Sequence, residues 1–143
     1  MPNRCLAALA LLVAFALAGS AGTALASRSA TRAQSNAVAQ AVKSSPVGGI
    51  NKVPTKRYTV TKVKISTVSP AWAMASLTPT RAFRKNFQTA TVVAVKLAGT
   101  SRWVVVDLGS SEVGCGIAPN AVLADLLALK GGEAPCPPGE GIA

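Results

Sequence analysis

Acid–base chemistry in this chain would depend on carboxylates, because the sequence contains no histidine. The lack of histidine excludes a Ser-His-Asp triad and a histidine general base. A glycosidase-type hydrolase needs two carboxylates facing each other across a cleft. A hydrolase that uses Asp107 or Glu112, with Asp125 as the third nearby acid, is therefore one hypothesis. The sequence favours structural roles instead, in which Asp107 caps the turn after its strand and Asp125 faces solvent or pairs with a lysine. We predict no catalytic residue.

The cysteines favour a structural role rather than a metal-binding or catalytic one. Cys5 lies in an N-terminal targeting segment, which leaves Cys115 and Cys136. Two cysteines in an exported chain predict a disulfide, which would close about 20 residues and stabilise the fold by about 3 kcal/mol. A metal site or a catalytic thiol is the alternative, but neither histidine nor a second cysteine pair supports it. We predict no metal site and no cofactor.

Basic residues dominate the rest of the chain. From Ser27 onward there are 14 Lys and Arg (15 in the sequence, less Arg4) and five Asp and Glu, a net charge of +9. Thirteen of these bases and no acid lie between Ser27 and Val106. This distribution favours an anionic partner such as a cell-envelope polymer, and solubility is the alternative explanation. The candidate anion-binding residues are Lys56, Arg57, Lys62, Lys64, Arg81, Arg84 and Lys85.

The first 26 residues have the pattern of a signal peptide. Arg4 precedes an apolar run, Leu6–Ala18, which is shorter than the roughly 20 residues that cross a bilayer. The small-x-small sequence that ends at Ala26 predicts cleavage before Ser27, with a retained membrane anchor as the alternative. We expect a protein that is secreted or associated with the cell envelope and has no transmembrane segment in its mature chain.

One domain is expected in the 117 residues that follow. Residues 27–56 are interpreted as a flexible N-terminus with a short helix and a loop, residues 57–137 as a compact domain, and residues 138–143 as a tail. The helix is predicted over Ala37–Lys43, after a cap at Ser35 or Asn36. A second helix follows Pro119, since leucines recur there at helical spacing.

Four strands are predicted between these helices, over residues 57–68, 72–77, 87–97 and 102–108. In the first strand, the apolar residues change from even to odd positions between Val60 and Val63. This change predicts a bulge near Thr61-Lys62 that leaves Lys62 and Lys64 facing solvent. Trp72 is expected to fill a small core, with ligand stacking as the alternative. The last two strands form a hairpin, and the run Trp103–Val106 is typical of a strand packed on both sides or near a sheet centre.

Residues 58–126 resemble a group of small exported bacterial proteins of uncharacterised function. The segments that carry the resemblance include Trp-Val-Val-Val-Asp-x-Gly-Ser from Trp103 and Val-Gly-Cys-Gly-x-x-Pro from Val113. The resemblance implies no activity.

Together these patterns predict an α+β fold: a short N-terminal helix, a four-stranded antiparallel meander, a C-terminal helix packed on the sheet, and one disulfide. Cystatin-like or NTF2-like sheets are analogous shapes. The expected function is a non-enzymatic binding or accessory domain that contacts anionic envelope polymers through its basic surface. The alternative is a protein–protein or inhibitor-like module that uses a sheet face or edge to bind another exported protein. No specific nucleic acid partner is predicted.

Overall fold

The computed structural model describes residues 27–44, 56–131 and 133–139. The predicted signal peptide, residues 45–55 of the predicted loop and the end of the predicted tail lie outside the described residues. Within the described part, no helix is both long enough and apolar enough to cross a membrane.

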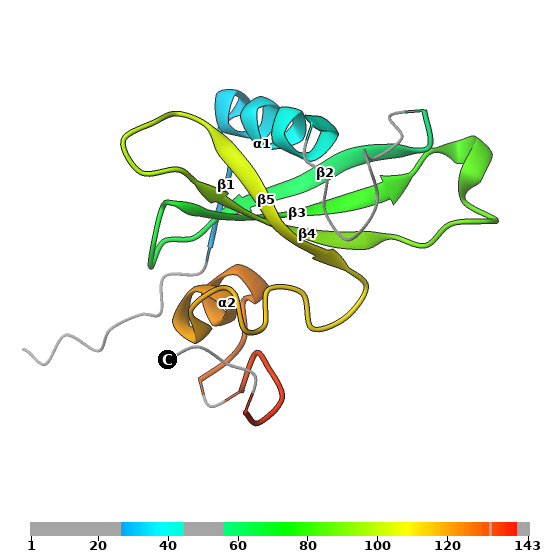
Figure 1. Ribbon diagram of the computed structural model, residues 1–143. Helices are drawn as coiled ribbons and strands as arrows, with labels where there is room; N and C mark the ends of the chain where they lie inside the picture. The colour runs from blue at the N-terminus through cyan, green and yellow to red at the C-terminus, as the bar shows by residue number, and fades with distance from the viewer. Residues whose placement is uncertain (1–26, 45–55, 132, 140–143) are drawn as a thin grey trace, which may run out of the picture.

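The fold is α+β, with one antiparallel sheet in the strand order β1-β2-β3-β4-β5 (Figure 1). The sheet has five strands, so the prediction of four was one short. The additional strand, β1, has only two residues, which pair with Ile65 and Lys64 at the outer edge of β2. It escaped prediction because two polar residues carry no strand periodicity. The strands are β1 (Arg28–Ser29), β2 (Tyr58–Ile65), β3 (Trp72–Pro79), β4 (Ala90–Lys96) and β5 (Trp103–Gly109).

Helix α1 (Arg32–Ser44) starts five residues before the predicted helix. Its cap is Thr31, whose hydroxyl accepts a bond from the Gln34 amide at 3.3 Å, while the Gln34 side chain accepts one from the Thr31 amide at 3.0 Å. This reciprocal pair is a capping box, so the predicted cap at Ser35 or Asn36 was wrong. The helix packs on the sheet, because Val38 and Val42 on one of its faces are 0% and 1% exposed.

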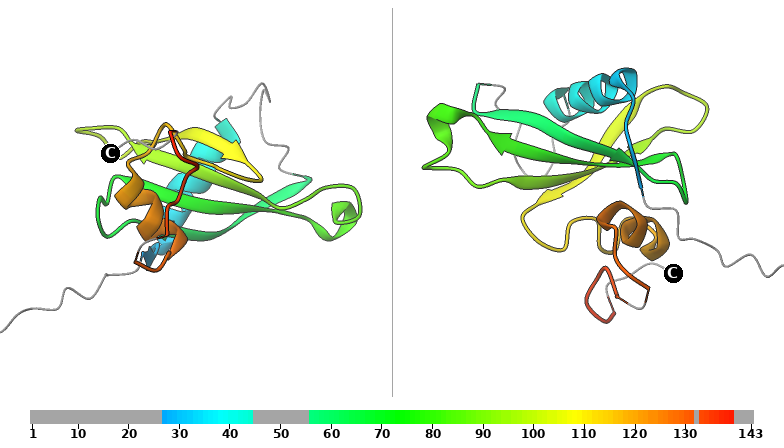
Figure 2. Two further views of the ribbon diagram at one scale, coloured as in Figure 1. Left: turned by 90° about the horizontal axis from the view of Figure 1, so that it is seen from below. Right: turned by 180° about the vertical axis from the view of Figure 1, so that it is seen from behind.

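The two helices cover opposite faces of the sheet (Figures 1 and 2). On one face, α1 packs against alternate residues of the strands, such as Ala73, Ala75 and Trp103. On the other face, α2 (Asn120–Leu127) packs its buried leucines against Met74 and Val93. Apolar residues therefore occur in continuous runs on β4 and β5, since both faces of these strands are buried.

The predicted bulge in β2 is confirmed. The register shifts between Thr61 and Lys64, so that two residues oppose Ala75, and Lys62 has a φ of 50°. As a result, Tyr58, Val60, Val63 and Ile65 all pack on the α1 side, as the change of parity predicted.

The predicted disulfide joins Cys115, in the loop after β5, to Cys136 in the C-terminal segment, with Cα atoms 5.6 Å apart. Both cysteines are half-buried, and they pack against the α2 core. The loop reaches this position through Gly114, whose φ is +92° and where a Cβ would lie 2.7 Å from a methyl group of Leu123. The disulfide therefore holds the chain that leaves α2 against the loop that enters it.

Candidate functional site

Five of the seven predicted basic contacts gather at one end of the sheet. The chain at the start of β2 lies beside the short 3-10 helix η1 (Arg81–Phe83), since the amide of Thr80 donates to the Arg57 carbonyl at 2.8 Å. The Thr80 hydroxyl also donates to the Lys56 carbonyl at 3.1 Å. All five side chains are exposed. We call this surface the basic tip; it consists of Lys56, Arg57, Arg81, Arg84 and Lys85.

An aromatic cluster supports the basic tip. The ring of Phe87 lies edge-on to Tyr58 and Phe83, at centroid distances of 5.7 and 5.8 Å. The guanidinium of Arg57 lies over both phenylalanine rings, 5.5 Å from Phe87 and 5.7 Å from Phe83. Each such cation–π contact contributes about 0.5–1 kcal/mol at an exposed site. The contacts favour a position of the guanidinium over the two rings, and its N–H groups can bind a phosphate or carboxylate through two hydrogen bonds.

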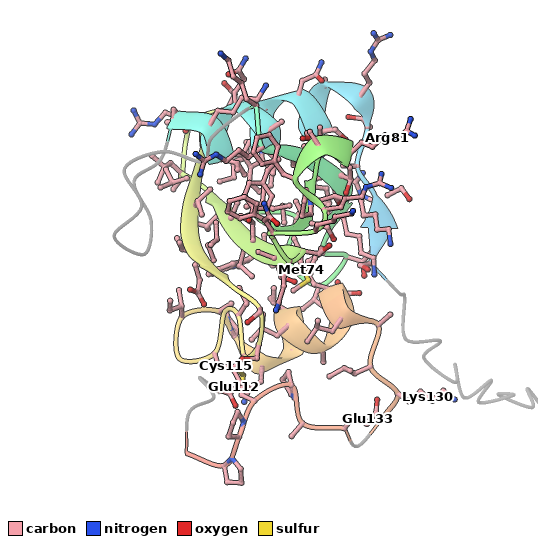
Figure 3. The ribbon with its side chains drawn as sticks, turned by 90° about the vertical axis from the view of Figure 1, so that its right-hand side faces the viewer. Met74, Arg81, Glu112, Cys115, Lys130 and Glu133 are labelled. Atoms are coloured by element: carbon pink, nitrogen blue, oxygen red, sulfur yellow. A yellow bond between two sulfur atoms is a disulfide. The ribbon has the colours of Figure 1, made fainter. Side chains whose placement is uncertain are left out.

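Three of the four remaining cations of the basic tip lie on the connection between β3 and β4 and are free to meet a ligand. Arg81, Arg84 and Lys85 have no hydrogen-bond or ion-pair partner among the described residues. All three are exposed, and Figure 3 shows Arg81 projecting from the segment between β3 and β4. Arg81, Arg84 and Lys85 were predicted as candidate contacts, but the sequence did not indicate that Tyr58, Phe83 and Phe87 form an aromatic cluster beside them.

Lys62 and Lys64 do not belong to this cluster. Lys62, at the bulge, is exposed as predicted. Lys64 was predicted to face solvent, but it is half-buried and its ammonium donates to the carbonyl of Leu126 at 3.2 Å. A cation at the carboxyl end of a helix stabilises it through the helix dipole. Lys64 therefore joins β2 to α2 and is a structural residue.

Asp125 also has a role that differs from the prediction. Instead of facing solvent or pairing with a lysine, its carboxylate accepts bonds from the β2–β3 loop. The donors are the Ser66 hydroxyl at 2.7 Å, the Thr67 amide at 2.7 Å, the Thr67 hydroxyl at 3.0 Å and the Val68 amide at 3.4 Å. Burial alone would raise the pKa of Asp125, but these four hydrogen bonds together hold its pKa below the usual 3.8.

Asp107 caps the chain after β5, as expected, but it also binds a residue beyond the predicted turn. Its two carboxylate oxygens accept bonds from the amides of Leu108, at 2.7 Å, and Gly114, at 2.6 Å. Glu112 is exposed within the same loop. Among the described residues, no group of three or more His, Cys, Asp or Glu side chains is placed to hold a metal ion.

Charge is thus divided across the molecule. In Figure 3, Arg81 lies on the α1 side, whereas Glu112, near Cys115, and Glu133, near Lys130, lie beyond α2. Trp72, weighed above as a stacking residue, is half-buried against the α2 core, which confirms the prediction of a packing role.

Scans against protein-family models and searches of curated proteins and of solved structures give no match to this chain. The resemblance of residues 58–126 to small exported bacterial proteins stays a prediction.

Proposed function

We propose that this protein is an exported, non-enzymatic binding domain that contacts anionic polymers of the cell envelope through the basic tip. The observation that carries the proposal is the clustering of five exposed cations at one end of the sheet, where the Arg57 guanidinium lies over the rings of Phe83 and Phe87. No acid occurs between Ser27 and Val106 to neutralise them. Such a field attracts polyanions and strengthens their binding.

Export is part of the proposal and has two supports. The first 26 residues have a signal-peptide pattern, and the Cys115–Cys136 disulfide is compatible with an oxidising compartment. The non-enzymatic part of the proposal is supported by two of the three acids weighed as catalytic, since the carboxylates of Asp107 and Asp125 accept hydrogen bonds from loops. A hydrolase of the glycosidase type would need two carboxylates directed at a substrate.

The test is sedimentation of residues 27–143 with isolated cell envelope at about 20 mM and about 150 mM salt. Contacts between exposed charges are screened at the higher salt, so binding should fall steeply. The double variant Arg84→Glu/Lys85→Glu should weaken binding at low salt about 30-fold, if each lost contact is worth about 1 kcal/mol. The matched control is Lys96→Glu/Lys130→Glu, which changes net charge equally at exposed sites outside the basic tip.

Two results would refute the proposal. Equal losses in the tip variant and the control would show that only net charge matters. Binding that persists at about 150 mM salt would assign the contact to an apolar surface instead.

A further inference from the structure

Strand β5 has one open edge. It is the last strand of the sheet and pairs only with β4 among the described strands. The Arg102 carbonyl accepts a bond from the Leu97 amide on the β4 side at 2.9 Å. Because backbone groups alternate in direction along a strand, the amides and carbonyls of Trp103 and Val105 are directed to the open edge. These are the groups that an added strand would bind.

A groove of about 520 Å³ lies between this edge and α1. Its α1 wall contains Ala37, Gln40 and Ala41, and its β5 wall contains Arg102, Trp103 and Val104. The two alanines are small, so they leave space beside the Trp103 ring that a larger side chain would fill. Figure 1 shows how β5 crosses close to α1 along this side of the sheet.

The charge of the groove indicates what occupies it. The guanidinium of Arg102 is exposed and has no hydrogen-bond or ion-pair partner among the described residues. The sequence from Ser27 to Val106, which forms both walls, contains no acid. A second copy of the chain would bring an equally basic groove to the same edge, and like charges oppose that pairing. An acidic segment of another protein is the occupant that this charge favours.

We propose that the α1–β5 groove binds an extended, acidic segment of a partner protein as a sixth strand on β5. Side chains alternate along a strand, so successive residues of the segment face opposite sides of the sheet. A residue opposite Trp103 faces α1 and places an apolar side chain over Ala37 and Ala41. Its neighbour lies opposite Arg102 and places a carboxylate beside the guanidinium. The recognised pattern is therefore a large apolar residue next to Asp or Glu.

The proposal is tested by selection from a displayed library of random octapeptides. The immobilised protein is residues 27–143 carrying Arg84→Glu/Lys85→Glu, so that the basic tip retains acidic peptides more weakly. This design keeps the result independent of the proposed function. Recovered peptides should place an apolar residue beside an acid, and their amide shifts in ¹⁵N–¹H spectra should concentrate on Trp103–Val105 and α1.

Variants of the groove give the decisive comparison. Arg102→Glu reverses the charge beside the groove, and Ala37→Phe fills the space in it. Each variant should weaken binding of a recovered peptide at least tenfold. Arg102→Gln serves if the charge reversal disturbs folding, as judged from thermal unfolding. Replacing the peptide residue opposite Trp103 by proline should abolish binding, because proline has no amide hydrogen to donate.

Three outcomes would overturn the proposal. The selection yields no peptide above a blank surface, or its peptides bind the groove variants and the parent equally. Alternatively, sedimentation shows a dimer that Ala37→Phe dissociates, which would make a second copy the occupant.

Discussion

Removal of the Asp125 carboxylate should destabilise the fold more than removal of any other acid in the described chain. Asp125→Ala would leave two hydroxyls and two amides of the Ser66–Val68 loop without their acceptor. Ser66 is fully buried, so its hydroxyl cannot turn to solvent. This loop connects β2 to β3, so a disturbed loop would also disturb the pairing of these two strands.

The size of the effect follows from the number and type of these bonds. Hydrogen bonds to charged groups contribute about 1.5–3 kcal/mol each, but four that share one partly exposed carboxylate are not additive. Water can also reach the Val68 amide, whose residue is exposed. We therefore expect Asp125→Ala to lower the free energy of unfolding by about 2–4 kcal/mol.

The pH dependence of the unfolding free energy separates the effect of the Asp125 charge from that of the side chain's shape. The folded pKa of Asp125 lies below its value in the unfolded chain, about 3.9. The contribution of the carboxylate is therefore complete above pH 5 and is lost as the pH falls through the folded pKa. Asp125→Asn keeps the shape of the side chain without its charge. The gap in unfolding free energy between wild type and Asp125→Asn should thus narrow from pH 7 to about pH 2.

Urea unfolding followed by tryptophan fluorescence measures these differences. The control is Glu112→Gln, which removes an exposed acid and should change stability by less than about 0.5 kcal/mol. Equal stability of wild type and Asp125→Ala at pH 7 would refute the reasoning. A gap between wild type and Asp125→Asn that stays constant down to pH 2 would refute its electrostatic part.

Three further predictions concern the elements around α2, and chemical denaturation checks each of them. Gly114→Ala should cost about 2–4 kcal/mol, since its φ is positive and the new Cβ would lie 2.7 Å from Leu123; Gly131→Ala, with open space around it, should be neutral. Lys64→Met should lower the free energy of unfolding by about 1 kcal/mol, because the bond to the end of α2 is lost. The control is Lys62→Met at the exposed bulge, which should leave that bond intact. Equal losses of stability in the two variants would contradict the structural role of Lys64. Reduction of the disulfide should cost about 3 kcal/mol, and an unchanged urea midpoint would contradict its stabilising role.

Local patterns made much of the sheet predictable. The bulge in β2 followed from the change of apolar parity between Val60 and Val63, because a buried face tolerates no mismatch in a strand. The hairpin of β4 and β5 followed from two β-branched runs that flank a short turn containing Gly99. The disulfide followed from the count of cysteines that remain after the targeting segment.

Contacts between distant segments could not be predicted in the same way. Asp125 and Thr67 are 58 positions apart, and nothing in the helix pattern around Asp125 indicates which loop it meets. Lys64 was predicted to face solvent from β2, because the sequence did not indicate that the Leu126 carbonyl of α2 lies beside it. The cap of α1, by contrast, was predicted at the wrong residues, although the spacing of Thr31 and Gln34, three residues apart, is that of a capping box.

Three acids of the described chain have structural partners away from the basic tip. Asp107, Asp125 and Glu133 accept hydrogen bonds from backbone amides at Gly114, Thr67 and Lys130. These carboxylates hold loops around α2, and among the described residues they form no ion pair with the cations of the basic tip. The basic tip and Arg102 thus keep their charge for partners outside the chain. Acids moved into the tip would leave the loops intact and would remove this field, which is why charge reversal there tests binding without testing folding.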